Sequence, residues 1–104
     1  MPESRAVQEN PIVQGQDEKL TYTLTVTPWG SDPSGVVVTA YDVTWGEYVD
    51  VSDKVLNGMP AAAGDVVTLP SVENLTAGHN YRIEILWLSG GNTFECFVDI
   101  KGER

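Results

Sequence analysis

The side chains best suited to catalysis are scarce in this chain. It holds one cysteine, Cys96, and one histidine, His79, in 104 residues. A cysteine nucleophile needs a base within hydrogen-bond reach. We expect these two side chains to lie about six residues apart along a sheet, or about 20 Å at the rise of a strand. The sequence therefore predicts no catalytic residues and no enzyme.

Ligands for a metal ion are equally few. A single cysteine and a single histidine cannot complete the ligand set of a structural zinc site. Calcium prefers oxygen ligands, which clustered carboxylates supply. Four carboxylates fall within twelve residues: Asp42, Glu47, Asp50 and Asp53. Because their spacing does not match an EF-hand loop, we expect them to face water. We expect no metal and no cofactor, with calcium as the alternative.

The charge balance excludes several kinds of partner. Fifteen acidic residues against six basic ones give a net charge of -9. Such a surface repels nucleic acid and anionic lipid. No secretory leader follows Met1, and no apolar run reaches the roughly 18 residues that a membrane span requires. We therefore expect a protein that is made in the cytoplasm and binds neither nucleic acid nor a membrane.

Much of the chain alternates between apolar and polar residues, a pattern typical of half-buried strands. Leu20 to Thr27 alternates without a break. In Val36 to Val43, either Val36, Val38 and Ala40 or the residues between them could turn inward, so the pattern leaves this register open. The predicted strands are residues 20–27, 36–43, 48–51, 65–69, 79–88 and 92–101.

Two segments are rich in polar residues and turn formers. Residues 1–16 are expected to be a flexible amino-terminal arm, in which only Ile12 and Val13 could add an edge strand. Residues 52–64 contain an Asn-Gly pair, a proline and three alanines. We predict a loop there, with a short helical turn at residues 53–56 as the competing interpretation.

The last two predicted strands are expected to form a hairpin. Gly90 and Gly91 suit a two-residue turn in which both central residues have positive φ. This turn sets Arg82 opposite Asp99, an attractive pair across the strands. It also makes one face of the hairpin apolar. The expected apolar pairs are Trp87 with Phe94, Ile85 with Cys96, Ile83 with Val98 and Tyr81 with Ile100.

These strands predict an all-β domain over residues 17–104. About seven short strands with regular turns, and no amphipathic helix, favour a two-sheet antiparallel sandwich. A small closed barrel is the alternative. A chain of this length can bury one core without a disulfide or a metal.

One motif narrows this architecture. Leu75, Thr76, Ala77 and Gly78 are followed by Tyr81, which opens an alternating strand. The run is similar to the crossing between sheets in fibronectin type III and related immunoglobulin-like domains. The resemblance implies an immunoglobulin-like, fibronectin type III-like sandwich with a structural tyrosine corner, in which the hydroxyl of Tyr81 bonds to backbone a few residues upstream. Because the chain has no cysteine pair, an antibody-type domain is excluded.

A second set of short motifs resembles bacteriophage tail and fibre-adaptor proteins. The set comprises the acidic lead at residues 17–22, the crossing at residues 75–78 and the glycine turn at residues 87–91. This resemblance implies a phage tail or virion component, or a protein used in its assembly.

The outward side of the last hairpin is expected to carry three large apolar side chains, Leu86, Leu88 and Phe97. Contiguous exposed apolar side chains commonly mark an interface. We predict that this trio binds a protein partner or a second copy of the chain. The alternatives are that the arm or residues 52–64 cover it, or that its exposure has no role.

Three aromatic residues give a second candidate site. Trp29 and Trp45 fall in predicted loops, with Tyr48 close to Trp45 in the sequence. Aromatic rings in loops stack on sugars or anchor a partner, although they also cap the ends of cores. A carbohydrate-binding or other ligand-binding module is therefore the alternative to the preferred function, a non-enzymatic structural or adaptor module.

Overall fold

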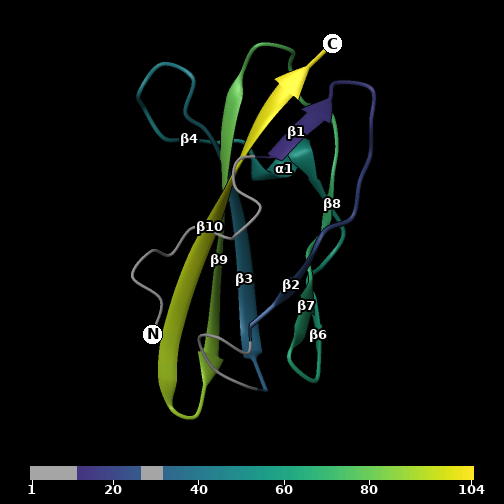
Figure 1. The fold of residues 1–104 in the computed structure, drawn as a ribbon. Coiled ribbons are helices and arrows are strands. Elements are labelled where there is room, and N and C mark those ends of the chain that lie inside the picture. Colours follow the sequence, from purple (N-terminus) through teal and green to yellow (C-terminus); the bar gives the residue numbers. More distant parts are fainter. Residues whose placement is uncertain (1–11, 27–31) are drawn as a thin grey trace.

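A computed structural model describes residues 12–26 and 32–104, which form an all-β domain with one short helix (Figure 1). The all-β prediction is confirmed. Residues 1–11 of the predicted arm, and Trp29, lie outside the described residues. The elements are β1 (Ile12–Gly15), β2 (Thr23–Thr25), β3 (Ser34–Asp42), β4 (Val49–Asp50), α1 (Ser52–Val55), β5 (Leu56–Asn57), β6 (Ala61–Ala63), β7 (Val66–Thr68), β8 (Ser71–Val72), β9 (Asn80–Ser89) and β10 (Asn92–Glu103).

The longest ladder is the β9–β10 hairpin. Its register is the predicted one, with Trp87 opposite Phe94 and each further apolar pair in place. Gly90 and Gly91 have φ of 56° and 81°, as the predicted turn requires. Buried and more exposed residues alternate along both strands. The hairpin therefore separates an inner, apolar face from an outer one.

This hairpin forms the centre of a five-stranded sheet. The strand order is β1-β10-β9-β3-β4 (Figure 1). β1 runs parallel to β10, and the other neighbours are antiparallel. β1 lies at the edge of this sheet and contains Ile12 and Val13, the two residues of the predicted arm that could add an edge strand; it pairs from Ile12 with Ile100 to Gly15 with Glu103.

A buried amide fixes β1 in the fold. Gln14 is 0% exposed, and its Nε2 donates to the carbonyl oxygens of Val72, at 2.8 Å, and Glu18, at 3.1 Å. The hydroxyl of Tyr22 donates to Gln14 Oε1 at 2.6 Å. Burial and the nearby Glu18 carboxylate raise the pKa of Tyr22, so the hydroxyl keeps its proton. Because a buried amide is costly unless it is hydrogen-bonded, these contacts hold the end of the predicted arm inside the folded unit.

The structure resolves the register that the sequence left open in β3. Val38 pairs with Ile85, and Ala40 pairs with Ile83. Ala40 is fully buried, so the even-numbered residues turn toward the core. Val37 turns outward and is 55% exposed.

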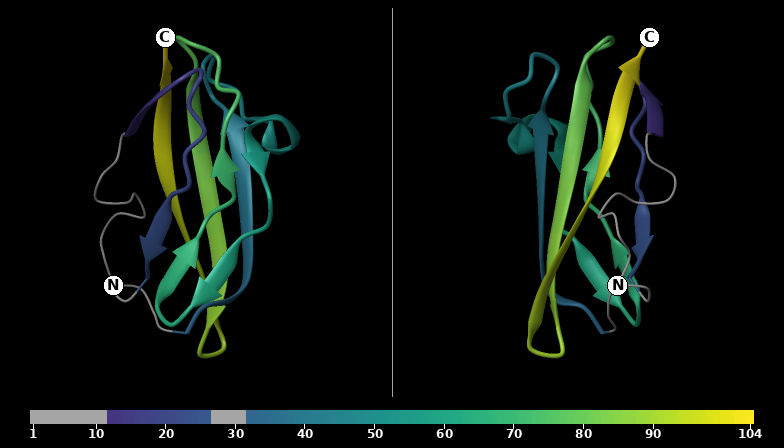
Figure 2. Two further views of the ribbon diagram at one scale, coloured as in Figure 1. Left: turned by 90° about the vertical axis from the view of Figure 1, so that its right-hand side faces the viewer. Right: turned by 60° about the vertical axis from the view of Figure 1, so that its left-hand side comes forward.

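Shorter ladders lie over the inner face of the five-stranded sheet (Figure 2). One has the order β2-β7-β6, and another pairs β5 with β8. An isolated bridge between Leu20 and Val72 connects the start of the β2 segment to β8. Of residues 20–26 of the predicted strand, Thr23–Thr25 form β2, and Thr27 lies outside the described residues.

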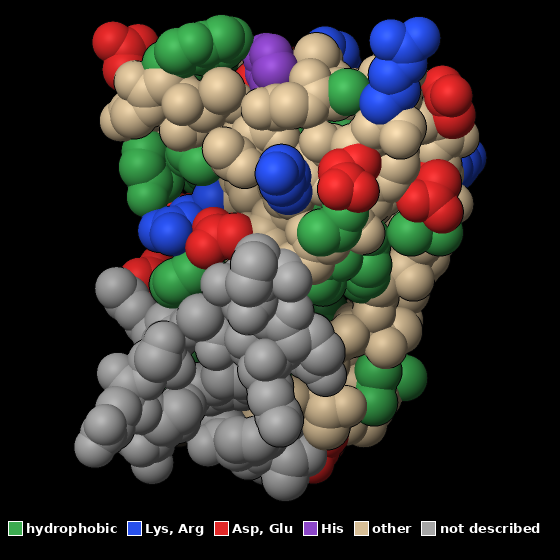
Figure 3. All heavy atoms as spheres, turned by 45° about the horizontal axis from the view of Figure 1, so that its top comes forward, with side chains coloured by type: hydrophobic (Ala, Val, Ile, Leu, Met, Phe, Trp, Pro, Cys, Tyr) green, Lys and Arg blue, Asp and Glu red, His purple; other side chains and the backbone are tan. Residues whose placement is uncertain are grey.

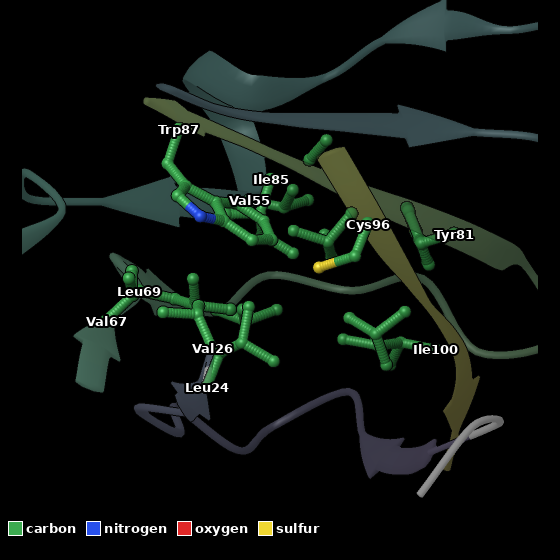
Figure 4. Close-up of a cluster of buried hydrophobic side chains, with 14 of the residues drawn as sticks. Leu24, Val26, Val55, Val67, Leu69, Tyr81, Ile85, Trp87, Cys96 and Ile100 are labelled. Atoms are coloured by element: carbon green, nitrogen blue, oxygen red, sulfur yellow. The ribbon is translucent and has the colours of Figure 1, made fainter. Parts of the chain in front are cut away.

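The core fills the space between these layers. In Figure 4, side chains of β9 and β10 such as Trp87 and Cys96 face Leu24, Val67 and Leu69 from the shorter ladders. Since each large aliphatic side chain contributes roughly 1.5–3 kcal/mol on burial, this packing is the main source of stability. Among residues 12–26 and 32–104, fifteen hydrophobic residues are buried: Leu24, Val26, Ala40, Val55, Val67, Leu69, Val72, Leu75, Tyr81, Ile83, Ile85, Trp87, Cys96, Val98 and Ile100.

The predicted loop over residues 52–64 is wrong, because this segment contains α1, β5 and β6. The competing interpretation, a helical turn at residues 53–56, is close to α1. Asp50 Oδ1 accepts the Ser52 N–H at 2.9 Å, and Val55 is fully buried, so both ends of the helical turn are held. β6 consists of alanines, which favour strands only weakly. Pairing with β7 overrides that preference.

Gly102 allows the loop before β9 to approach the sheet. A Cβ added at Gly102 would lie 2.5 Å from the carbonyl oxygen of Thr76. The backbone here is also joined by hydrogen bonds from Gly78 N to Gly102 O, at 2.9 Å, and from Gly102 N to His79 O, at 3.0 Å. A residue without a side chain is therefore required at position 102.

We expect Gly102→Ala to lower the free energy of unfolding by about 2 kcal/mol, because the added methyl group overpacks this contact. Urea denaturation followed by tryptophan fluorescence measures the change. Lys101→Ala, at an exposed neighbouring position, is the control and should change stability by less than about 0.5 kcal/mol. A wild-type midpoint for Gly102→Ala would contradict the prediction.

Candidate functional site

The loop that precedes β9 has the geometry of a tyrosine corner. The hydroxyl of Tyr81 accepts a hydrogen bond from the backbone N–H of Thr76 at 2.8 Å. Tyr81 and Leu75 are buried, and Gly78 has a φ of 85°, which glycine adopts without strain. Tyr81, Leu75 and Gly78 stabilise the crossing between the layers and present no reactive side chain at the surface.

Two of the three residues predicted for the interaction face lie together in the open. Leu86 is 37% exposed and Leu88 is 45% exposed. Val37, directly opposite Leu86 in the register, extends them into a group that we call the apolar patch: Val37, Leu86 and Leu88. Residues 52–64, which were expected to be able to cover this face, form α1, β5 and β6 instead, and the patch stays exposed. Because the sequence left the register of residues 36–43 open, it did not identify Val37 as an outward residue.

The third predicted residue, Phe97, has a different environment. The guanidinium carbon of Arg82 lies 4.0 Å from the centre of the Phe97 ring, and Phe97 is only partly exposed. Arg82 Nε donates to Asp99 Oδ1 at 2.9 Å, and its Nη1 donates to the Tyr48 hydroxyl at 2.9 Å. The Asp99 hydrogen bond is the main cause of a raised pKa for Arg82, so the charge over the ring is permanent. Arg82 therefore shields Phe97 from solvent, so Phe97 is less exposed than the two leucines.

A hollow lined in part by Arg82 lies beside the apolar patch. We call it the acidic hollow, because two of its walls are the carboxylate side chains of Glu84 and Glu95. Its volume is about 200 Å³. Glu95 is opposite Leu86 in the ladder, so the hollow adjoins the apolar patch. The lining residues are Tyr48, Arg82, Glu84, Glu95, Cys96 and Phe97.

The two described aromatic residues of the alternative ligand site, Trp45 and Tyr48, contact different rings. Trp45 is 76% exposed and contacts the ring of His79 edge-on, with ring centres 4.8 Å apart. Tyr48 is 54% exposed and contacts Tyr41 instead, with ring centres 5.4 Å apart. Figure 3 brings the end of the domain near the β3–β4 connection forward and shows hydrophobic side chains intermixed there with acidic and basic ones. Trp29, the third member, lies outside the described residues.

His79 and Cys96 lie in separate environments. Cys96 is buried opposite Ile85, and burial raises the pKa of its thiol to about 12. Such a thiol stays protonated at neutral pH and is a poor nucleophile. His79 Nδ1 lies 2.7 Å from Asp42 Oδ2, a contact across 37 residues that no sequence pattern signalled. The histidine therefore has a carboxylate partner but no thiol beside it.

Asp42 is the centre of a small hydrogen-bond network. Its Oδ1 accepts hydrogen bonds from the Thr44 N–H, at 3.0 Å, and from the Thr44 hydroxyl, at 2.5 Å. Partial burial by itself raises the pKa of Asp42, but the hydrogen bonds from Thr44 and His79 outweigh it, and the pKa lies below its ordinary value of 3.8. The network ties the β3–β4 connection to the start of β9.

No family model matches the chain, and no curated protein matches it. Among residues 12–26 and 32–104, no group of three or more His, Cys, Asp or Glu side chains is placed to hold a metal ion. No helix in the same residues has the length and apolar character needed to cross a membrane.

Because folding lowers the pKa of Asp42, its ionised form stabilises the fold above about pH 4, and this contribution is lost as the pH falls through the lowered pKa. We expect Asp42→Asn to cost about 1 kcal/mol at neutral pH. It should also reduce the fall in unfolding free energy on acidification. Urea denaturation across the acid range measures both effects. Asp53→Asn, on the exposed side of α1, should keep the wild-type slope, and an unchanged slope in Asp42→Asn would contradict the prediction.

Proposed function

We propose that this chain is a non-enzymatic structural or adaptor module that binds another protein through the outer face of its five-stranded sheet. The observation that carries the proposal is the apolar patch. Val37, Leu86 and Leu88 are adjacent in the ladder and remain exposed. Removing such side chains from water on binding contributes roughly 25 cal/mol per Å², and patches of this kind mark interfaces.

We infer that the framework is an immunoglobulin-like, fibronectin type III-like sandwich of two sheets. The bridge between Leu20 and Val72 supports this, because it joins the shorter ladders into one layer opposite the five-stranded sheet. The hydrogen bond from Thr76 to the Tyr81 hydroxyl supports it as well, since a tyrosine corner is a recurrent feature of such sandwiches.

A non-enzymatic role agrees with the state of the reactive side chains. The thiol of Cys96 is buried and protonated, and His79 is bound to Asp42. The virion is the setting that the resemblance to phage tail and fibre-adaptor proteins implies for such a module. Capsid, portal or tail genes beside the gene for this chain would support that setting, and genes of a metabolic pathway would count against it.

A photo-crosslinking side chain in place of Leu88 tests the proposal in the cells that make this protein. We expect a covalent adduct with a second polypeptide, because Leu88 lies in the apolar patch. The same group at Val66, an exposed position on β7 in the other layer, is the matched control and should give no such adduct. Adding Leu86→Ser should reduce the Leu88 adduct about tenfold, since part of the apolar contact is lost.

Gels and mass spectrometry of the crosslinked peptide give the yield and the partner. Equal adducts at positions 66 and 88, or none at either, would refute a binding role for the outer face. An adduct between two copies of the chain would keep the role and identify the partner as the chain itself.

A ligand-binding module is the second candidate, and the exposure of Trp45 favours it. An indole that is 76% exposed at the end of a domain, and fixed by a contact with His79, could stack on a sugar ring. Under this proposal, glycan-array or calorimetric binding is lost in Trp45→Ala and largely kept in Trp45→Phe. Wild-type protein that binds no glycan would reject the candidate.

A further inference from the structure

The side of β3 that faces away from β9 is only partly covered by β4, which pairs with two residues of it. Beyond them, Val51 N donates to the carbonyl oxygen of Ala40 at 2.9 Å, and Ala40 N donates to Ser52 Oγ at 2.9 Å. The backbone groups of Ala40 therefore face this side. Because backbone groups on one side of a strand recur at every second residue, the N–H and C=O of Val38 face it as well. Within the part of the chain that the structure describes, no strand pairs with Val38 there.

The short helix α1 is the reason that this side stays uncovered. The register between β3 and β4 would place Asp53 opposite Val38 if β4 continued. Residues Ser52–Val55 form α1 instead, and the buried side chain of Val55 holds this turn to the core. The chain then continues as β5, which pairs with β8 and not with β3. We call residues 36–38, on the side away from β9, the open edge of β3.

A groove of about 440 Å³ lies along the open edge. One wall consists of Val36, Val37 and Val38, and the other comes from α1 and the residues after it, including Leu56 and Met59. Figure 2 shows α1 beside β3. Met59 is 86% exposed, although methionine is apolar. Because Val37 also belongs to the apolar patch, the groove and the apolar patch form one continuous surface.

Among the described residues that line this groove, Asp53 carries the only charge. Asp53 is exposed, and its side chain makes no ion pair within residues 12–26 and 32–104. The neighbouring Lys54 is directed elsewhere, since its Nζ lies 3.5 Å from Thr76 Oγ1. A cation that reaches the groove would therefore find a carboxylate without a competing partner.

We propose that the partner of the outer face adds an extended polypeptide segment as a short strand along the open edge of β3. The main chain of the segment pairs with the N–H and C=O of Val38, and an apolar side chain enters the groove between Val38 and Leu56. A lysine or arginine of the segment contacts Asp53. Addition of a strand to a sheet edge is a recurring mode of peptide recognition. This inference rests on the proposed function, because it states how the partner binds at the same surface.

Charge favours a different protein over a second copy of the chain as the source of this strand. A symmetric contact between two copies sets the same surface against itself. It would bring the Asp53 side chains of both copies to one shared edge. Each copy also carries a net charge of -9, so long-range repulsion opposes the approach. A segment with a basic residue gains from both effects.

A nine-residue synthetic peptide tests the proposal against the full-length, ¹⁵N-labelled protein. The peptide alternates valine with threonine and ends in lysine, and the same peptide with N-methylated amides is the control because it cannot donate to a strand. We expect the unmodified peptide to slow the hydrogen exchange of the Val38 amide about tenfold. The amides of Val37 and Thr39, which already face β9, should keep their rates. Equal effects of the two peptides, or no protection of Val38, would overturn the proposal.

Variants at Val38 isolate the main-chain contact. Val38→Pro removes the N–H at the open edge and leaves the β3–β9 hydrogen bonds in place, a position where proline is tolerated in strands. It should weaken the peptide about fivefold, because one hydrogen bond is lost. Val38→Thr keeps both the N–H and the shape and should bind within twofold of wild type. Equal affinity of the two folded variants would contradict strand addition.

Variants at Asp53 test the charge without altering the backbone. Asp53→Asn should weaken the lysine peptide about threefold, as expected for an exposed ion pair. Glu47→Gln removes the same charge at an exposed position outside the groove and should leave the affinity unchanged. Equal weakening in both variants would reject the contact with Asp53.

A photo-crosslinking side chain at Met59, in the cells that make this protein, separates this inference from the proposed function. We expect its adduct to contain the same polypeptide as the Leu88 adduct, and Val38→Pro should reduce the Met59 adduct about fivefold. A Leu88 adduct without a Met59 adduct would overturn strand addition and leave the binding role intact. A Met59 adduct between two copies of the chain would replace the foreign strand by a second copy. Absence of any Leu88-specific adduct would remove the binding role itself.

Discussion

The ten residue pairs of the β9–β10 ladder are the constraint on which the rest of the structure depends. Successive side chains of a strand point to opposite faces, so one register assigns every residue of both strands to the core or to the surface. The ladder buries Ile83, Ile85 and Trp87 and turns Leu86 and Leu88 outward. β1 and β3 then pair with its two edges, and the shorter ladders cover its inner face.

The arrangement of side chains on the outer face depends on the ion pair between Arg82 and Asp99. A one-residue slip of the hairpin would break this pair and bring the apolar inner side chains to the surface. Because the pair also holds the guanidinium over Phe97, it reduces the exposed apolar area of the outer face. The same contact therefore specifies the register and shapes the candidate binding surface.

The parts that the sequence predicted correctly are those set by neighbouring residues. Strand alternation and a glycine pair were enough to place Trp87 opposite Phe94. The parts that it missed depend on contacts between distant segments. The hydrogen bonds of Gln14 reach Val72 across 58 residues, and Gly102 is required only because Thr76 lies against it. For the candidate site, the sequence indicated the two leucines, but the outward turn of Val37 and the shielding of Phe97 follow from neighbouring strands.

The two faces of the same strands separate the residues that stabilise the fold from those that we propose bind a partner. The inner side chains of β9 and β10 are confined by packing, where a change of one methylene group is felt. The outer ones are more exposed, and surface substitutions away from special contacts usually change stability by less than about 0.5 kcal/mol. Leu86 and Leu88 thus contribute little to the core while losing the gain that burial would bring. A partner that covers the apolar patch, as proposed above, would remove that cost, as Arg82 does for Phe97.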